Sequence, residues 1–392
     1  MSGMEIRASA SLASIFALRM LGLFLFLPIF AVYAKTLPDG ANASLVGLAM
    51  GMYGLAQSFG QIPFGMASDR YGRKRIIVIG LILFAIGSFI AASADSVFWI
   101  MIGRAVQGAG AISAAITAFI ADSTREQHRT KAMAMVGASI GLTFAASMVI
   151  APLLYSWIGM SGIFVLTGVL SLAAIGVVLF VVPDAPMVSA GRVPLMQIVK
   201  HGELMRLNFG VFVLHMGQVA MFMVLPSAMV QYLGLPVEQH WKVYLPVVLA
   251  SFLFMLPPVF IGEKHGKMKQ VFVLAIGLLL AVQAGMWAAL SHPGTHWGVL
   301  VGLLLAFFIA FNVLEACQPS LVSRIAPPSS KGSALGVYNT LQSLGLFAGG
   351  AIGGLLRQYE GPASVFILCA VATAIWLVVA LKMKNLPRRG QA

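Results

Sequence analysis

Four ionisable side chains lie deep inside long apolar stretches of the sequence, one in each stretch: Arg19, Arg104, His215 and Glu315. A charge at the middle of a bilayer costs about 2.5 to 3.5 kcal/mol on insertion scales, so such side chains face a protein interior or a water-filled cavity and usually pair. Burial favours the protonated form of a carboxyl group, whereas a nearby arginine favours the ionised form. Because Glu315 is the only acid of the four, we predict that it binds and releases protons, with Arg19, His215 and Arg104 around it.

Two other roles for Glu315 are open from the sequence. A permanent salt bridge to Arg19 or His215 would only hold parts of the chain together, and direct contact with a substrate would need no proton exchange. Depth favours a shared polar path, because Arg19, His215 and Glu315 each lie roughly nine residues, or about 13 Å, from the same end of their apolar stretch. Arg104 enters from the opposite side.

Charged residues also concentrate in residues 65–75, a short loop between two apolar stretches that reads Gly-Met-Ala-Ser-Asp-Arg-Tyr-Gly-Arg-Lys-Arg. Its positive charges alone would serve as a stop-transfer signal. That interpretation explains neither the acid nor the two glycines. Carboxylate and guanidinium groups at helix ends can hold neighbouring helices together. We therefore predict a latch that includes Gly65, Asp69, Arg70, Gly72 and Arg73.

The composition indicates a polytopic membrane protein, since 59% of the 392 residues are hydrophobic and 9% are charged, against about 25% charged in soluble domains. The net charge of +13 does not indicate nucleic-acid binding, because the Lys and Arg residues fall in short loops between apolar stretches. Cys317 and Cys369 lie in apolar stretches without disulfide or metal-ligand spacing. The sequence shows no nucleophile–base pair and no ATP-binding loop, so we expect no cofactor, no metal site and no enzymatic activity.

Apolar stretches of roughly 18 or more residues predict twelve transmembrane helices. This all-α membrane fold would consist of two six-helix bundles, residues 1–182 and 206–392, joined by a linker at 183–205 that contains three prolines. Most of the 25 Lys and Arg residues fall in loops on the side of the amino terminus, which predicts that both termini are cytoplasmic. The predicted helices cover residues 11–34, 44–67, 76–94, 96–121, 131–156, 162–182, 206–232, 241–261, 270–290, 297–323, 332–356 and 362–381.

An internal repeat supports the division into halves. Leu18-Arg19-Met20 is echoed by Leu214-His215-Met216, and the loop at residues 69–75 is echoed by residues 263–269. In both pairs the two copies are separated by about half the chain. Duplicated six-helix units are how many secondary transporters are built, with their binding sites near the middle of the membrane.

Uncharged polar residues and small residues complete the candidate set. The polar residues, together with plentiful methionines, predict a mixed and adaptable substrate cavity, with core or lipid-facing packing as the alternative. Glycines at spacings of four predict close helix packing. The predicted cavity residues are Tyr53, Gln57, Gln61, Asn312, Tyr338, Asn339 and Gln342. The predicted packing glycines are Gly137, Gly141, Gly345, Gly349 and Gly353.

The loop Gly65-x-x-x-Asp69-Arg70-x-Gly72-Arg73-Lys74 resembles the signature that the major facilitator superfamily carries between its second and third helices. Residues 102–108 resemble the helix-four motif of its drug:proton antiporters, while Gly137 and Gly141 match the helix-five antiporter motif only in part. The resemblance extends along the whole chain and implies that helices one, four, seven and ten line the cavity. It also implies that Asp69 faces the start of helix eleven near residues 330–332, and that Arg73 pairs with Asp122.

Together these observations predict a secondary transporter that exports small amphipathic, drug-like compounds in exchange for protons by alternating access. Its partners would be a small-molecule substrate, protons and the lipid bilayer of the inner (plasma) membrane, and the chain would act as a monomer. Symport or facilitated diffusion of a specific metabolite is the main alternative. A membrane sensor or channel that does not transport is the other.

Overall fold

The computed structural model of the protein describes residues 1–184, 195–292, 294–327 and 331–384. All regular elements in these ranges are helical. The chain divides into two compact units, Met1–Gly191 and Arg192–Ala392. Residues 185–194 of the predicted linker at 183–205 lie outside the described residues, while its described part contains a short helix and the start of the next long helix, at Gly202.

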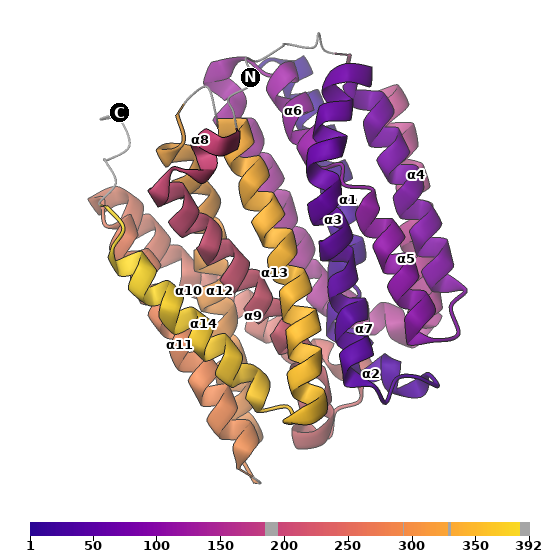
Figure 1. Ribbon diagram of the computed structural model, residues 1–392, viewed down its shortest axis with the longest axis vertical. Helices are drawn as coiled ribbons and strands as arrows, with labels where there is room; N and C mark the ends of the chain where they lie inside the picture. The colour runs from indigo at the N-terminus through magenta and orange to yellow at the C-terminus, as the bar shows by residue number, and fades with distance from the viewer. Residues whose placement is uncertain (185–194, 293, 328–330, 385–392) are drawn as a thin grey trace. The chain divides into compact units, whose positions relative to one another are not determined.

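Unit 1 contains the first six predicted spans (Figure 1). The second and third predicted spans are each one helix, and the fourth is a pair of helices. The fifth and sixth are joined in one long helical run. Its elements are α1 (Gly3–Phe24), α2 (Leu27–Tyr33), η1 (Ala34–Thr36), α3 (Ala43–Tyr71), α4 (Arg73–Ala92), α5 (Val97–Ala109), α6 (Ser113–Ser123), α7 (Glu126–Gly176) and η2 (Val177–Val181).

Unit 2 contains the last six spans, each as one long helix (Figure 1). A short helix, α8, precedes them, and a short turn, η3, separates the first two. Its elements are α8 (Leu195–Val199), α9 (Gly202–Leu233), η3 (Val237–Gln239), α10 (Trp241–His265), α11 (Met268–Ser291), α12 (Trp297–Ile325), α13 (Lys331–Tyr359) and α14 (Ser364–Leu381).

The first span begins earlier than the prediction of residue 11. Ser2 and Glu5 form a capping box at the start of α1, in which each side chain accepts a hydrogen bond from the other's backbone N–H. The Glu5 carboxylate also accepts from the backbone and side chain of Arg125, at 3.0 Å in both cases. This contact raises the pKa of the Arg125 guanidinium. Glu5 therefore lies within the first turn of α1 and joins it to the start of α7.

Two predicted spans are interrupted at glycines. The fourth is broken between α5 and α6 at Gly110, where a Cβ would lie 2.3 Å from the carbonyl oxygen of Gly80, so glycine is needed for α4 to approach this closely. The fifth and sixth spans meet within α7 at Gly159, whose φ of 64° is left-handed and favours glycine. The predicted span at 96–121 is present as one run, Val97–Ser123, whose helix is interrupted at residues 110–112, and the division between the fifth and sixth spans is also present.

Nine helical runs in the described ranges are long and apolar enough to cross a membrane. One of them, Lys131–Val181, holds two of the predicted spans. The helices that fall short are α3 and α13, whose apolar character is diluted by glycine and by the predicted cavity residues. Helices of this kind span membranes when their polar side faces protein or a water-filled space instead of lipid.

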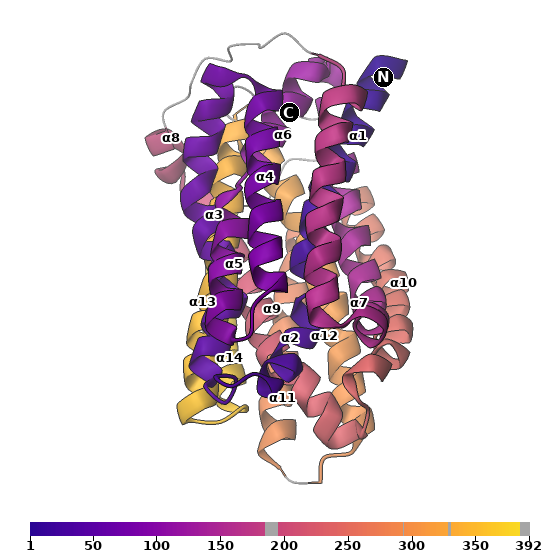
Figure 2. The ribbon, with the colours of Figure 1, turned by 90° about the vertical axis from the view of Figure 1, so that its right-hand side faces the viewer.

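The packing of helices within one unit recurs in the other. In unit 1, α1 packs on α7, α3 on α5, and α4 on α5 and α7, as Figure 2 shows for α3, α4 and α5. In unit 2, α9 packs on α13, α10 on α12, and α11 on α12 and α14. Each contact in one list has its counterpart at the equivalent span of the other, so the two units are repeats of one six-helix bundle.

Candidate functional site

In unit 2, His215 of α9 lies beside Glu315 of α12 and Gln342 of α13. The imidazole Nε2 is 3.5 Å from the Glu315 carboxylate and 2.7 Å from the amide nitrogen of Gln342. Its Nδ1 lies 3.0 Å from the backbone carbonyl of Val211, one turn earlier in α9. Side chains from three helices, α9, α12 and α13, thus converge at one polar point in the bundle.

The hydrogen-bond partners of His215 determine which ring nitrogen can exchange a proton. A carbonyl oxygen can only accept, so Nδ1 carries a hydrogen and donates it to Val211. The amide nitrogen of Gln342 can only donate, so Nε2 accepts from it. An ionised Glu315 would then place two acceptors 3.5 Å apart. A hydrogen on the carboxyl group would supply the donor that this contact lacks.

The two predicted arginines lie close together in unit 1. Arg19 of α1 donates from Nη1 to the Ser113 hydroxyl at 2.8 Å. Arg104 of α5 donates from Nη1 to Gln107 at 3.0 Å and to the Gly22 carbonyl at 3.4 Å. The guanidinium carbons of both arginines lie near the same Tyr53 ring, at 5.6 Å for Arg19 and 4.8 Å for Arg104. Two buried positive charges therefore share one aromatic side chain.

Three of the predicted cavity residues follow one face of α3 in unit 1, at spacings of four. Tyr53, Gln57 and Gln61 are all buried. The Tyr53 hydroxyl, the Gln57 carbonyl oxygen and both polar atoms of the Gln61 amide have no hydrogen-bond partner within the described part of the chain. Buried polar atoms without partners are uncommon, and they mark a place where a ligand or water is expected.

In contrast to those on α3, predicted cavity residues of unit 2 have side-chain hydrogen-bond partners. Asn312 donates to the Ser251 hydroxyl at 3.0 Å, and the Tyr338 hydroxyl donates to Gln318 at 3.2 Å. These two side chains therefore help to join α10, α12 and α13 within the bundle. Gln342 is part of the His215 cluster, and Asn339 lies on α13 one turn before Ser343, whose hydroxyl donates to its backbone carbonyl.

The charged loop joins the ends of three helices in unit 1. Gly72 links α3 to α4 with a φ of 101°, which favours glycine. Arg73, the first residue of α4, donates from Nε to Asp122 at the end of α6, at 2.8 Å. It also pairs with Asp69 and donates to the Ser68 hydroxyl at 2.7 Å. The predicted Arg73–Asp122 contact is thus present, and Arg73 connects α3, α4 and α6.

Other parts of the predicted latch are placed less specifically. The Arg70 guanidinium lies over the Tyr71 ring, 5.4 Å from its centroid, and a Cβ at Gly65 would only touch Ala114, at 3.5 Å. The predicted target of Asp69, residues 330–332, lies partly outside the described residues, which do not include residue 330. Its role there stays a prediction.

Unit 2 contains a counterpart of this connection that the sequence did not reveal. Arg324 at the end of α12 pairs with Glu263 near the end of α10, at 2.9 Å. The charges are reversed, because in unit 1 the end of the fourth span supplies the acid. The internal repeat gives a signal for Glu263, because this residue aligns with Asp69 of unit 1. It gives none for Arg324, because the corresponding residue of unit 1, Asp122, is an acid.

The predicted packing glycines fall into two groups. A Cβ at Gly345 or Gly349 would lie 2.4 or 2.2 Å from the backbone carbonyl oxygens of Phe212 and Met216, so α13 and α9 are in backbone contact. At Gly353 the nearest atoms are those of Ala220, at 3.4 Å. A Cβ at Gly137 or Gly141 would meet nothing within 4 Å among the described residues. The close approach predicted for helix five is therefore not found there.

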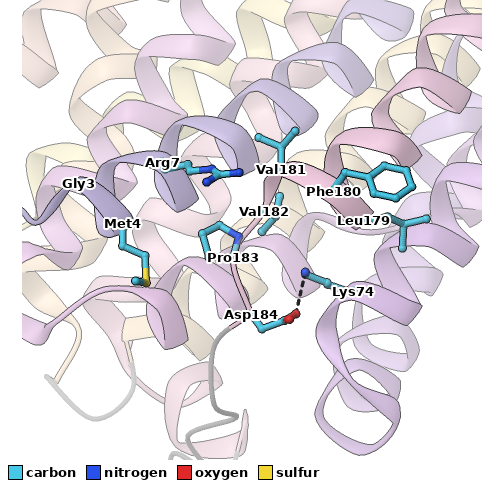
Figure 3. Close-up of a pocket in the computed structure, with 10 residues that line it drawn as sticks. All are labelled: Gly3, Met4, Arg7, Lys74, Leu179, Phe180, Val181, Val182, Pro183 and Asp184. Carbon is cyan, nitrogen blue, oxygen red and sulfur yellow. Dashed lines mark ion pairs between the residues drawn. The ribbon is translucent and has the colours of Figure 1, made fainter.

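A surface hollow of about 490 Å³ lies in unit 1, away from the residues described above (Figure 3). Apolar residues 179–183 form much of its wall, with Met4 and Arg7 of α1 at one side. The Lys74 ammonium group at its edge pairs with Asp184 at 2.7 Å. That carboxylate balances the charge of Lys74.

Two repeated six-helix membrane bundles, each with ionisable or polar groups held inside it, define a polytopic membrane protein of the secondary-transporter class. The sequence model of the Major Facilitator Superfamily matches residues 12–350 and 207–392. The chain belongs to this superfamily and is a membrane transporter, not an enzyme.

The relatives agree with this assignment. Inner membrane transport protein YajR of Escherichia coli (strain K12) is 42% identical over 389 residues, which cover 98% of this chain and 84% of that protein. The resemblance to YajR-type transporters, carried by residues 18–22, 61–65 and 124–127, is thereby confirmed. Multidrug resistance protein MdtH of Proteus mirabilis (strain HI4320) is 26% identical over 351 residues, which cover 85% of this chain and 82% of that protein.

A solved structure supports the fold. The crystal structure of a bacterial homolog of the human lysosomal transporter Spinster, in an inward-facing and occupied conformation, aligns with a TM-score of 0.76. The alignment covers 100% of both chains at 13% sequence identity. At this identity the likeness shows the major facilitator fold alone.

Proposed function

We propose that this transporter exports small amphipathic, drug-like compounds in exchange for protons by alternating access. The observation that carries the proposal is the His215–Glu315 contact, in which one ring nitrogen is fixed by Val211 and the other faces a carboxylate at 3.5 Å. A site that holds one exchangeable proton inside an apolar bundle is what coupling to a proton gradient requires. The relative MdtH is a multidrug resistance protein, which supports this substrate class.

The energy available to such an exchange is sufficient for uphill export. Each pH unit across the membrane supplies about 1.4 kcal/mol per proton. A membrane potential of about 100 mV adds about 2.3 kcal/mol per charge moved inward. We propose that the protein lies in the inner (plasma) membrane as a monomer with both termini cytoplasmic, since this orientation places most Lys and Arg residues on the cytoplasmic side.

The test of this function uses the purified full chain in proteoliposomes with an imposed pH gradient. A pH-sensitive dye reports the lumen while candidate compounds, including cationic, neutral and anionic amphiphiles, are added outside. Antiport predicts that a transported compound moves faster with the gradient than without it and that its movement dissipates the gradient. A compound that moves at one rate regardless of the gradient would indicate facilitated diffusion instead. Movement of compound and protons in the same direction would indicate symport.

The Arg73 cluster is proposed to act as a latch at the cytoplasmic end of unit 1. The side chain of Asp122 is only 7% exposed, so removal of Arg73 leaves a buried carboxylate without its cation, which is strongly unfavourable. We expect Arg73→Ala to lower the transport rate about tenfold or more while the protein still inserts and elutes as a single species in detergent. Asp69→Asn should impair transport as well.

Lys74→Ala is the matched control for the latch prediction. It removes the next positive charge in the chain, but its partner Asp184 is 92% exposed, and ion pairs of this kind contribute little. Initial efflux rates, normalised to protein inserted, distinguish the variants. Unchanged rates in both Arg73→Ala and Asp69→Asn would rule out the latch.

A further inference from the structure

The positive charge inside unit 1 is not balanced by any acid described there. Arg19 is 2% exposed and Arg104 is fully buried. The acids of unit 1 whose side chains are described lie at helix ends, and those with ion pairs contact Arg73, Lys74 or Arg125. None of these described acids pairs with Arg19 or Arg104. Two like charges held near one Tyr53 ring in a medium of low polarity repel each other, and a bound anion would relieve this repulsion.

The two arginines differ in how far their charges are already stabilised. The Arg104 guanidinium lies 4.4 Å from the Phe26 ring centroid and 4.8 Å from that of Tyr53, and two acceptors contact its Nη1. Aromatic faces at this distance stabilise a desolvated cation. Arg19 has one hydroxyl partner, Ser113, and a single ring at 5.6 Å. In both arginines Nε and Nη2 have no hydrogen-bond partner within the described part of the chain. The difference is that two aromatic faces stabilise the charge of Arg104, whereas Arg19 has one more distant ring.

The geometry of Arg19 leaves a carboxylate-binding edge unused. Ser113 takes Nη1, while Nε and Nη2 have no hydrogen-bond partner within the described part of the chain. These two nitrogens form the side of the guanidinium group that donates two parallel hydrogen bonds to a carboxylate. Ser113 thus orients the group and leaves the paired donors available.

Additional unsatisfied polar atoms belong to α3. The Tyr53 ring contacts Arg19, and Gln57 and Gln61 follow it at one-turn intervals on the same face of the helix. Their buried amide and hydroxyl groups include donors that could bind the polar part of a ligand. A buried cation with a free pair of donors, next to further donors in an apolar wall, is suited to an amphipathic anion.

We propose that Arg19 binds the carboxylate of the transported compound, so that the preferred substrates are small organic anions with an apolar body. This inference rests on the proposed export function, which it narrows from amphipathic compounds in general to anions. Arg104 acts on this site indirectly, because its positive charge makes the electrostatic potential near Arg19 more favourable for an anion.

The test is a binding measurement on the purified full chain in detergent, without any membrane gradient. The probes are two matched sets: 1-naphthoate, 1-naphthamide and 1-naphthylmethylammonium, and 4-phenylbutyrate, 4-phenylbutyramide and 4-phenylbutylammonium. Titration calorimetry at fixed pH and ionic strength gives the Kd of each. The wild type should bind at least one carboxylate about tenfold or more tightly than its amide, with the ammonium compound weakest.

Variants assign the preference to Arg19. Arg19→Gln should abolish the carboxylate preference, and Arg19→Lys should keep part of it, because lysine retains the charge without the paired donors. Arg7→Gln is the control, because it removes an exposed charge from the same helix and should change nothing. If Arg19→Gln does not fold, the wild-type and Arg19→Lys comparisons still decide the question.

The outcomes separate this inference from the proposed function. If both carboxylates bind no better than their amides, or if Arg19→Gln keeps the preference, the anion site is overturned even where proton-coupled transport is found. If carboxylates bind through Arg19 but their movement is independent of the pH gradient, the anion site stands and the proposed antiport fails.

Discussion

Glu315→Gln is expected to abolish efflux driven by a pH gradient while downhill exchange of substrate continues. The substitution keeps the size and hydrogen-bonding capacity of the side chain but removes its ability to gain or lose a proton. With Glu315 neutral at every pH, the contact with His215 at 3.5 Å no longer changes with proton binding. The proton and substrate cycles then lose their connection, although the path through the bundle stays open.

The measurement compares two assays in the same proteoliposomes. Uphill accumulation driven by an imposed pH gradient should fall by about a hundredfold or to background, while counterflow of labelled substrate at equal pH should stay within a few-fold of wild type. Glu360→Gln is the matched control, because this acid is exposed at the end of α13. Full uphill transport by Glu315→Gln, with unchanged pH dependence, would exclude this residue as the coupling group.

His215 provides a check on the same interpretation. If the two side chains share one proton, then replacing both should cost little more than replacing Glu315 alone, because either loss removes the shared site. A double variant, Glu315→Gln with His215→Gln, that is far worse than the single variants would indicate that each residue has a separate role.

The transmembrane spans could be predicted from the sequence because lipid offers backbone N–H and C=O groups no hydrogen-bond partners. In lipid, only closed hydrogen bonding within helices satisfies the peptide groups, so long apolar stretches become helices. The same rule does not predict where a helix breaks. At the interruption, Gly110 packs against the carbonyl oxygen of Gly80 in another helix, and a local sequence window contains no information on that neighbour.

The residues of the candidate site could be predicted from the sequence, but their contacts and hydrogen-bond roles could not. The rarity of His215 and Glu315 in apolar stretches was enough to single them out. Their contact depends on how α9 and α12 pack, and the tautomer of His215 depends on the Val211 carbonyl. A backbone acceptor of this kind is present at every residue, so no side-chain pattern distinguishes it. The same applies to Arg19, whose free donors follow from the single contact with Ser113.

Glycine spacing shows most directly where a sequence pattern stops being informative. Gly137 and Gly141 in α7 have the same spacing as Gly345 and Gly349 in α13, and both sets lie in equivalent spans of the two repeats. Only the second set is in backbone contact with a neighbouring helix. Spacing predicts that two helices can approach closely. Whether they do so depends on the partner.

The difference between the two pairs of glycines predicts opposite effects on stability when alanine replaces one glycine of each pair. Gly349→Ala would place a Cβ 2.2 Å from the Met216 carbonyl oxygen, a backbone atom that cannot rotate away. The helices α9 and α13 must then separate, at a cost of about 1 to 3 kcal/mol for overpacking. Gly141→Ala meets no atom of the described residues within 4 Å and should be neutral or stabilising by up to about 1 kcal/mol, because alanine favours the helix.

Thermal unfolding of the two variants in the same detergent tests this pair. Gly349→Ala should lower Tm by several degrees and broaden the elution profile, whereas Gly141→Ala should leave Tm unchanged or slightly raised. His215 lies next to Met216 on α9, so moving α9 away from α13 should also disturb the contact between His215 and Glu315. Gly349→Ala should therefore lose more gradient-driven efflux than its lower stability explains. Equal stability of the two variants would mean that α13 and α9 are not in the backbone contact described here.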